Sequence, residues 1–170
     1  MAIVSQTNQK LGGTETALSI GVGGAIRPYE VVVDIEKALA DLTAAGTTFV
    51  QGTDSLQIPI MTLPVGTYFA GIDAEIVDTL VITGSPTTDL GFDASDPDDY
   101  IDAQSTTAIG RYTMVATAPV TPVIITTART IYIEFNGSTL ITSGKVAVTI
   151  WAGMAAKANV GRASHRTYAH

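Results

Sequence analysis

The strongest constraint on the fold of this chain is its excess of β-branched residues over leucine. Valine and isoleucine together number 32 and threonine 25, whereas leucine numbers only 9. β-Branched side chains pack well on a pleated surface and lose rotamer freedom in a helix. A chain of 170 residues has room for one ordinary domain, with or without extended arms. We therefore expect a single all-β domain.

Short segments of alternating hydrophobicity make this expectation more specific. Apolar and polar residues alternate in runs of five to eight residues, with turn signals between them, which is typical of an antiparallel β-sandwich. We predict a jelly-roll-like sandwich with one short helix and extended N- and C-terminal arms. The predicted strands cover residues 29–33, 56–61, 68–77, 87–92, 112–116, 123–127, 130–135 and 145–150.

Within these strands the alternation predicts which side chains face the core. The predicted inward residues are Leu56, Ile58 and Ile60; Ile72, Ala74 and Ile76; Ile131, Ile133 and Phe135; and Val146, Val148 and Ile150. Asp73 and Glu75 are expected on a solvated outer face. Pro59 lacks a backbone N–H, so its strand is expected at a sheet edge.

Two connections have distinctive sequences. Asp34 is a suitable N-cap for a helix over residues 35–45, which ends before Gly46 and covers one end of the core. Its apolar stripe consists of Ile35, Ala38, Leu39 and Leu42. Residues 136–144 join the last two strands as a loop; alternatively, Asn136-Gly137 forms a tight hairpin, with residues 138–142 as a strand of their own.

The two ends of the chain differ from the middle. Residues 1–28 are polar and glycine-rich and are interpreted as an N-terminal arm, residues 29–151 as the β-sandwich core, and residues 152–170 as a basic C-terminal arm. The last segment has a charge of +3, against −7 for the whole chain, which leaves −10 on the remainder. This asymmetry favours an arm that reaches an acidic neighbour, such as another copy; a frayed terminus is the alternative.

Composition argues against several function classes. A net charge of −7 and a pI of 4.5 do not suit a nucleic-acid binder. The absence of cysteine removes disulfides and thiol nucleophiles, and both histidines, His165 and His170, lie near the C-terminus. The sequence has no apolar run long enough to span a membrane and no signal peptide pattern. We therefore expect no enzymatic activity, no cofactor and no membrane association.

An aspartate-rich stretch is the one candidate metal site. Asp93, Asp96, Asp98 and Asp99 have the oxygen ligands that Ca²⁺ prefers, but their spacing does not match an EF-hand. A structural role is favoured, with Asp96 capping a short helix through residues 100–103. Ca²⁺ binding remains the alternative.

Low charge points to contact with a partner. Only 15% of the residues are charged, against about 25% in typical domains, so part of the apolar surface is expected to meet another molecule. Trp151, at the end of the last strand, is interpreted as an anchor of the core rim or of an oligomer contact. The candidate contact residues for self-association or capsid binding are Pro59, Trp151, Lys157, Arg162, Arg166 and Tyr168.

Three motifs carry a family resemblance. Residues 63–67 (LPVGT), 88–91 (TDLG) and 96–102 (DPDDYID) resemble the patterns LPAG, LDVG and GDPDAYLDA of a family of small structural proteins of tailed bacteriophages. Val33-Asp34 with the following helix, and the β-rich residues 146–151, also fit. The resemblance covers about residues 29–151.

The resemblance implies a virion component. The β-sandwich members of this family are similar to capsid decoration (cement) proteins, which sit on the head shell and often form trimers. The implied function is to decorate and stabilise a phage capsid by binding the major capsid protein and self-associating, on the capsid surface of a virion assembled in the host cytoplasm. A phage tail or fibre protein, or a carbohydrate-binding β-sandwich module, is the alternative.

Overall fold

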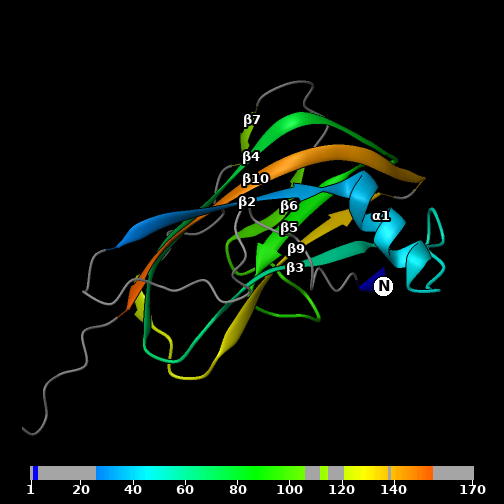
Figure 1. Cartoon of the computed structure of the whole chain (residues 1–170). Coiled ribbons are helices and arrows are strands. Elements are labelled where there is room, and N and C mark those ends of the chain that lie inside the picture. Colours follow the sequence, from blue (N-terminus) through cyan, green and yellow to red (C-terminus); the bar gives the residue numbers. More distant parts are fainter. Residues whose placement is uncertain (1, 4–25, 106–111, 115–120, 138, 155–170) are drawn as a thin grey trace, which may run out of the picture.

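Two β-sheets face each other in the computed structural model, which describes residues 2–3, 26–105, 112–114, 121–137 and 139–154 (Figure 1). Sheet A contains, in spatial order, β1 (Ala2–Ile3), β3 (Leu56–Leu63), β9 (Arg129–Asn136), β5 (Thr87–Gly91) and β6 (Ile101–Ser105). Sheet B contains β2 (Arg27–Asp34), β10 (Leu140–Met154), β4 (Thr67–Thr83) and β7 (Tyr112–Met114), and β8 (Val123–Ile124) also pairs with β4.

The strand order is that of a jelly roll. With the short strands β1 and β8 set aside, the first, last, third and sixth strands form sheet B, and the second, seventh, fourth and fifth form sheet A. Every pairing is antiparallel except that of β1 with β3. The predicted all-β sandwich of jelly-roll type with one short helix is confirmed.

The core lies between the two sheets, as the predicted alternation of inward and outward side chains requires. In β4, β9 and β10 the residues predicted to face inward are all buried. Phe69 of β4 is fully buried and packs against Phe92 and Tyr100, with ring centroids 5.4 and 5.3 Å away. β4 is 17 residues long and therefore runs well past the predicted strand.

The predicted phase of β3 is wrong after Pro59. A β-bulge lies between Pro59 and Met61, so the alternation changes side there. Met61 is buried and Ile60 is only half-buried, the reverse of the prediction. β1 pairs with β3 only at Leu56 and Gln57, so no described strand lies outside β3 at Pro59.

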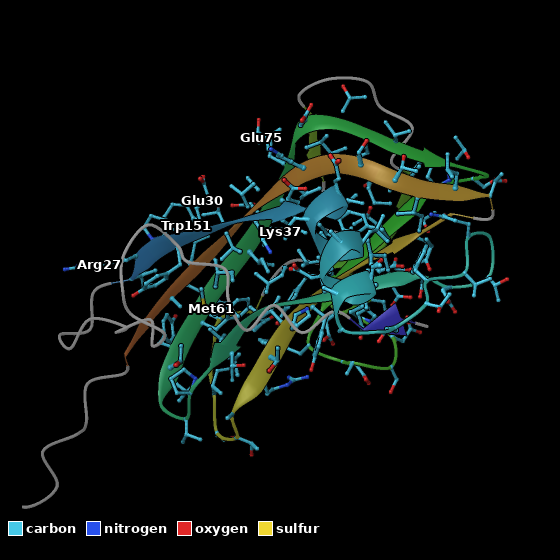
Figure 2. All side chains as sticks on the ribbon, turned by 45° about the vertical axis from the view of Figure 1, so that its right-hand side comes forward. Arg27, Glu30, Lys37, Met61, Glu75 and Trp151 are labelled. Atoms are coloured by element: carbon cyan, nitrogen blue, oxygen red, sulfur yellow. The ribbon has the colours of Figure 1, made fainter. Side chains whose placement is uncertain are left out.

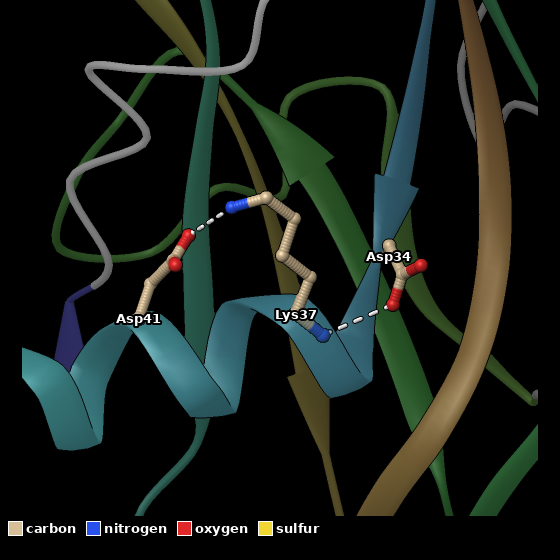
Figure 3. Close-up of polar contacts among 3 residues, drawn as sticks. All are labelled: Asp34, Lys37 and Asp41. Carbon is tan, nitrogen blue, oxygen red and sulfur yellow. Dashed lines mark hydrogen bonds and ion pairs between the residues drawn. The ribbon is translucent and has the colours of Figure 1, made fainter.

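The helix α1 (Ile35–Ala44) begins and ends as its sequence predicts, at one end of the sandwich (Figure 1). The Lys37 amide donates a 3.0 Å hydrogen bond to the Asp34 carboxylate, which confirms the N-cap (Figure 3). Lys37 also forms an ion pair with Asp41 one turn later, at 2.6 Å. Ile35, Ala38 and Leu42 are buried against the sandwich, and Leu39 is half-buried.

The last two long strands do not form a hairpin with each other. β9 belongs to sheet A and β10 to sheet B, so the residues between them cross from one sheet to the other. The alternative hairpin at Asn136-Gly137 is therefore wrong, and β10 already begins at Leu140. The side chain of Gln51 fixes this crossing because it both accepts from and donates to the Ile141 backbone, at 2.7 Å each.

Both predicted arms overlap with sheet B. Arg27 and Pro28 are the first residues of β2, and β10 extends through residues 152–154. Ala2 and Ile3 form β1. Residues 4–25 and 155–170 lie outside the described part of the chain.

Candidate interaction surface

The aspartate-rich stretch forms an extended loop and a strand. The predicted short helix over residues 100–103 is wrong, because Tyr100 donates its amide to the Leu90 carbonyl and so begins the pairing of β6 with β5. The Asp99 carboxylate accepts from the Phe92 amide at 2.7 Å, and the Asp93 carboxylate accepts from the Ser95 amide at 2.7 Å. Strand pairing therefore replaces helix capping here.

The four candidate calcium ligands do not converge. Asp93, Asp96, Asp98 and Asp99 are all exposed. Within the described residues, no group of three or more histidine, cysteine or acidic side chains is placed to hold a metal ion. Asp99 lies 3.9 Å from Arg129, whose guanidinium stacks over the Phe92 ring. These contacts give the stretch a structural role in the loop.

A row of buried polar side chains crosses the outer side of sheet A. Gln57, Glu134 and Asp89 are cross-strand neighbours on β3, β9 and β5, and all three are buried. Gln57 donates to the Ala94 carbonyl at 2.9 Å, so the aspartate-rich loop lies over this row. Alternation predicts the side on which these residues lie, but it carries no information about the loop that covers them.

The Asp89 carboxylate is held by two donors. The Asn136 amide group donates to it at 2.7 Å. The Ala103 backbone amide also donates to it, opposite the bulge that interrupts the pairing of β5 with β6. Burial raises the pKa of Asp89, the Ala103 hydrogen bond opposes this, and the nearby charge of Glu134 adds to the rise.

Replacement of Asp89 by asparagine tests this arrangement. The two donors bind different carboxylate oxygens, and asparagine replaces one of these oxygens with an NH2 group that cannot accept. We therefore expect the free energy of unfolding to fall by about 1–2 kcal/mol at pH 7. The pKa of Asp89 is higher in the folded protein than in the unfolded chain, so protonation of its carboxyl raises the free energy of unfolding. This contribution is complete below pH 3.8 and is lost as the pH rises through the raised pKa of the folded state. The difference between wild type and Asp89→Asn should therefore widen from pH 7 to pH 4 in urea unfolding. A difference that narrows at pH 4 would contradict this assignment.

The outer face of sheet B is different, because no described element covers it. It is built from outward side chains of β2, β10 and β4. Val32 and Val77 are 39% and 40% exposed, and Trp151 is 39% exposed. The Trp151 indole donates to the Asp73 carboxylate at 3.0 Å, which fixes the ring at one end of this face.

A shallow groove runs along β10 on this face. Small residues of β10, Ala147 and Thr149, form its floor. Glu30 of β2 stands on one side, and Asp73 and Glu75 of β4 stand on the other. Its volume is about 350 Å³. We call this feature the acidic groove; Figure 2 shows Glu30, Glu75 and Trp151 along the strands of sheet B.

A second hollow, of about 400 Å³, lies beside the end of α1. Leu39, Thr43, Phe49 and Gln51 are among the residues that line it, and none of its described lining residues is titratable. Of these two hollows, only the acidic groove is lined by charged side chains.

The structure does not bring the predicted contact residues together on one surface. Trp151 lies on the outer face of sheet B, whereas Pro59 lies at the bulge of β3 in sheet A. The other four, Lys157, Arg162, Arg166 and Tyr168, lie outside the described residues. The acidic groove was missed by the sequence analysis, although the alternation of Asp73 and Glu75 with Ala74 indicates one of its walls.

No helix among the described residues is both long and apolar enough to cross a bilayer.

The fold and this surface define a jelly-roll β-sandwich with an open sheet face. No protein-family model matches the chain, and no curated protein matches its sequence. A solved chain of the cyanophage Pam1 capsid asymmetric unit has a similar structure, with a TM-score of 0.51 and 17% sequence identity. The match covers 88% of this chain and 99% of that chain. The two chains share a fold.

Proposed function

We propose that this chain is a structural protein of a phage virion that decorates and stabilises the capsid. The observation that carries the proposal is the structural match, which extends over nearly the whole of a chain from a capsid asymmetric unit. The three motif resemblances in residues 63–102 support the same class independently of the fold. We place the protein on the capsid surface, after assembly in the host cytoplasm.

The chemistry of the surface suits permanent association. The outer face of sheet B presents Val32, Val77 and Trp151 around a groove, and the chain as a whole has few charges. A contact of about 1,000 Å² is enough for specific binding. Repetition over a symmetric shell adds avidity to each single contact.

We propose the major capsid protein as the partner and a homotrimer as the assembled form. We assign the protein no catalytic role and no cofactor. Several described acidic groups have structural contacts: Asp34 caps α1, Asp99 closes a loop and Asp89 accepts from two donors.

Binding to capsids tests this proposal. The full chain should co-sediment with purified capsids that lack it and should raise their temperature of disruption. Replacement of Trp151 by alanine should weaken the binding about tenfold or more, because a large, partly exposed aromatic residue at a contact contributes strongly to affinity. The matched control is Val50→Ala, which removes a residue that is 49% exposed in the loop after α1.

Absence of capsid binding would overturn the proposal. If the same protein bound a defined glycan at micromolar strength on an array, the fibre or carbohydrate-binding function would replace it. Equal weakening by Trp151→Ala and Val50→Ala would remove the outer face of sheet B from the contact.

A further inference from the structure

The outer face of sheet B is acidic in the middle, and the described residues leave it uncovered. Glu30, Asp73 and Glu75 surround the groove floor, and none of the described residues that line it is basic. Lys145, farther along β10, is paired with Asp34 at 3.4 Å. A positively charged segment would therefore complement this groove.

The same chain contains a segment of complementary charge. Residues 155–170 carry Lys157, Arg162 and Arg166 and no acidic residue. The residues between these cations are Ala-Asn-Val-Gly at 158–161 and Ala-Ser-His at 163–165, most of which have small side chains. A segment with several small side chains suits a shallow groove whose floor is formed by Ala147 and Thr149.

We propose that residues 155–170 of one copy bind in the acidic groove of a second copy. This proposal deepens the proposed function, because it names the surface and the segment through which the copies associate. The apolar rim formed by Val32 and Trp151 adds contact area beside the charged groups.

The path of β10 favours a second copy over the same chain. β10 passes along the groove, continues beyond Trp151 and reaches the end of the sheet at residue 154 (Figure 1). Its direction there is away from the groove, so a segment that returned to its own groove would have to reverse beside Trp151. Sixteen residues span about 50 Å when extended, which is enough to reach a neighbouring domain.

The test uses the full-length chain in sedimentation velocity. The groove variant is Glu30→Gln/Asp73→Asn/Glu75→Gln, and the tail variant is Lys157→Gln/Arg162→Gln/Arg166→Gln. Each should weaken self-association about tenfold at low salt, and raising the salt should weaken the wild type similarly, because salt screens exposed charges. The matched control, Glu36→Gln/Asp96→Asn/Asp98→Asn, removes three exposed acidic charges elsewhere and should associate like wild type.

Mixing the two variants identifies which copy supplies the tail. The groove variant has an intact tail and the tail variant has an intact groove, so an equimolar mixture should recover one-to-one complexes. Failure to recover them would overturn binding between copies, and a monomeric wild type would do the same. Urea unfolding of each variant verifies that it is folded.

Sedimentation velocity is carried out without capsids, so self-association and capsid binding are measured separately. If self-association proceeds through other surfaces while co-sedimentation with capsids is retained, the groove assignment fails and the decoration function stands. If self-association follows the groove and the tail but capsids are not bound, the decoration function fails alone.

Discussion

Replacement of Gly144 by alanine should destabilise the protein by about 4 kcal/mol. Gly144 lies in β10 with φ at +121°, a conformation that residues with a Cβ rarely adopt. A Cβ there would come 2.7 Å from the Leu80 Cα and 2.7 Å from the Thr79 carbonyl oxygen. Because these neighbours are backbone atoms of β4, only a shift of the central strand pair can relieve the overlap. Urea unfolding of Gly144→Ala measures the loss.

Gly46 provides the matched control for this effect. It has φ at +75° after α1, but an added Cβ would meet nothing within 4 Å. Gly46→Ala should therefore show only the conformational cost, about 1 kcal/mol. If the two alanine variants lost equal stability, the close approach of β4 to Gly144 would not be the cause.

The second large effect is expected at Phe69. Truncation of Phe69 to alanine should lower the free energy of unfolding by about 3–5 kcal/mol, because the ring is fully buried and the cavity is only partly refilled. Its loss also removes the edge contact with Phe92, which itself packs edge-on against Tyr100 at 5.5 Å. Since domains of this size are stable by only about 5–15 kcal/mol, part of the population should unfold near 37 °C.

Phe69→Leu separates cavity formation from a general response to substitution. Leucine keeps most of the apolar volume, so the expected loss is at most about 1.5 kcal/mol. Thermal unfolding of both variants, followed by circular dichroism, should show a much larger decrease in melting temperature for alanine than for leucine. Similar decreases would mean that Phe69 does not fill the space between the sheets.

The sequence predicted the fold wherever local pattern and tertiary contact agree. In β9, Ile131, Ile133 and Phe135 keep one phase for the whole strand, and all are buried. At α1, the cap residue Asp34 and the apolar stripe act within the helix itself, so its limits were visible in the sequence. Neither element depends on a distant residue for its identity.

The predictions failed where contacts over long sequence distances decide the structure. The bulge after Pro59 depends on the register with β9, about 70 residues later, and no local pattern encodes it. Asp96 and Pro97 are good helix-starting residues, but the pairing of Ile101 with Leu90 prevails over local capping. The acidic groove, likewise, combines one residue of β2 with two of β4 across β10, so its walls are remote from each other in the sequence.

The central position of β10 has a consequence for how the protein acquires its structure. β2 and β4 flank β10 and do not pair with each other, so sheet B remains open until residues 140–154 have been synthesised. Until then both strands present unsatisfied edges to other molecules. Pairing over such sequence separations is slow and exposes a chain to aggregation. We therefore expect nascent chains of this protein to be most prone to aggregation in the interval before β10 is inserted.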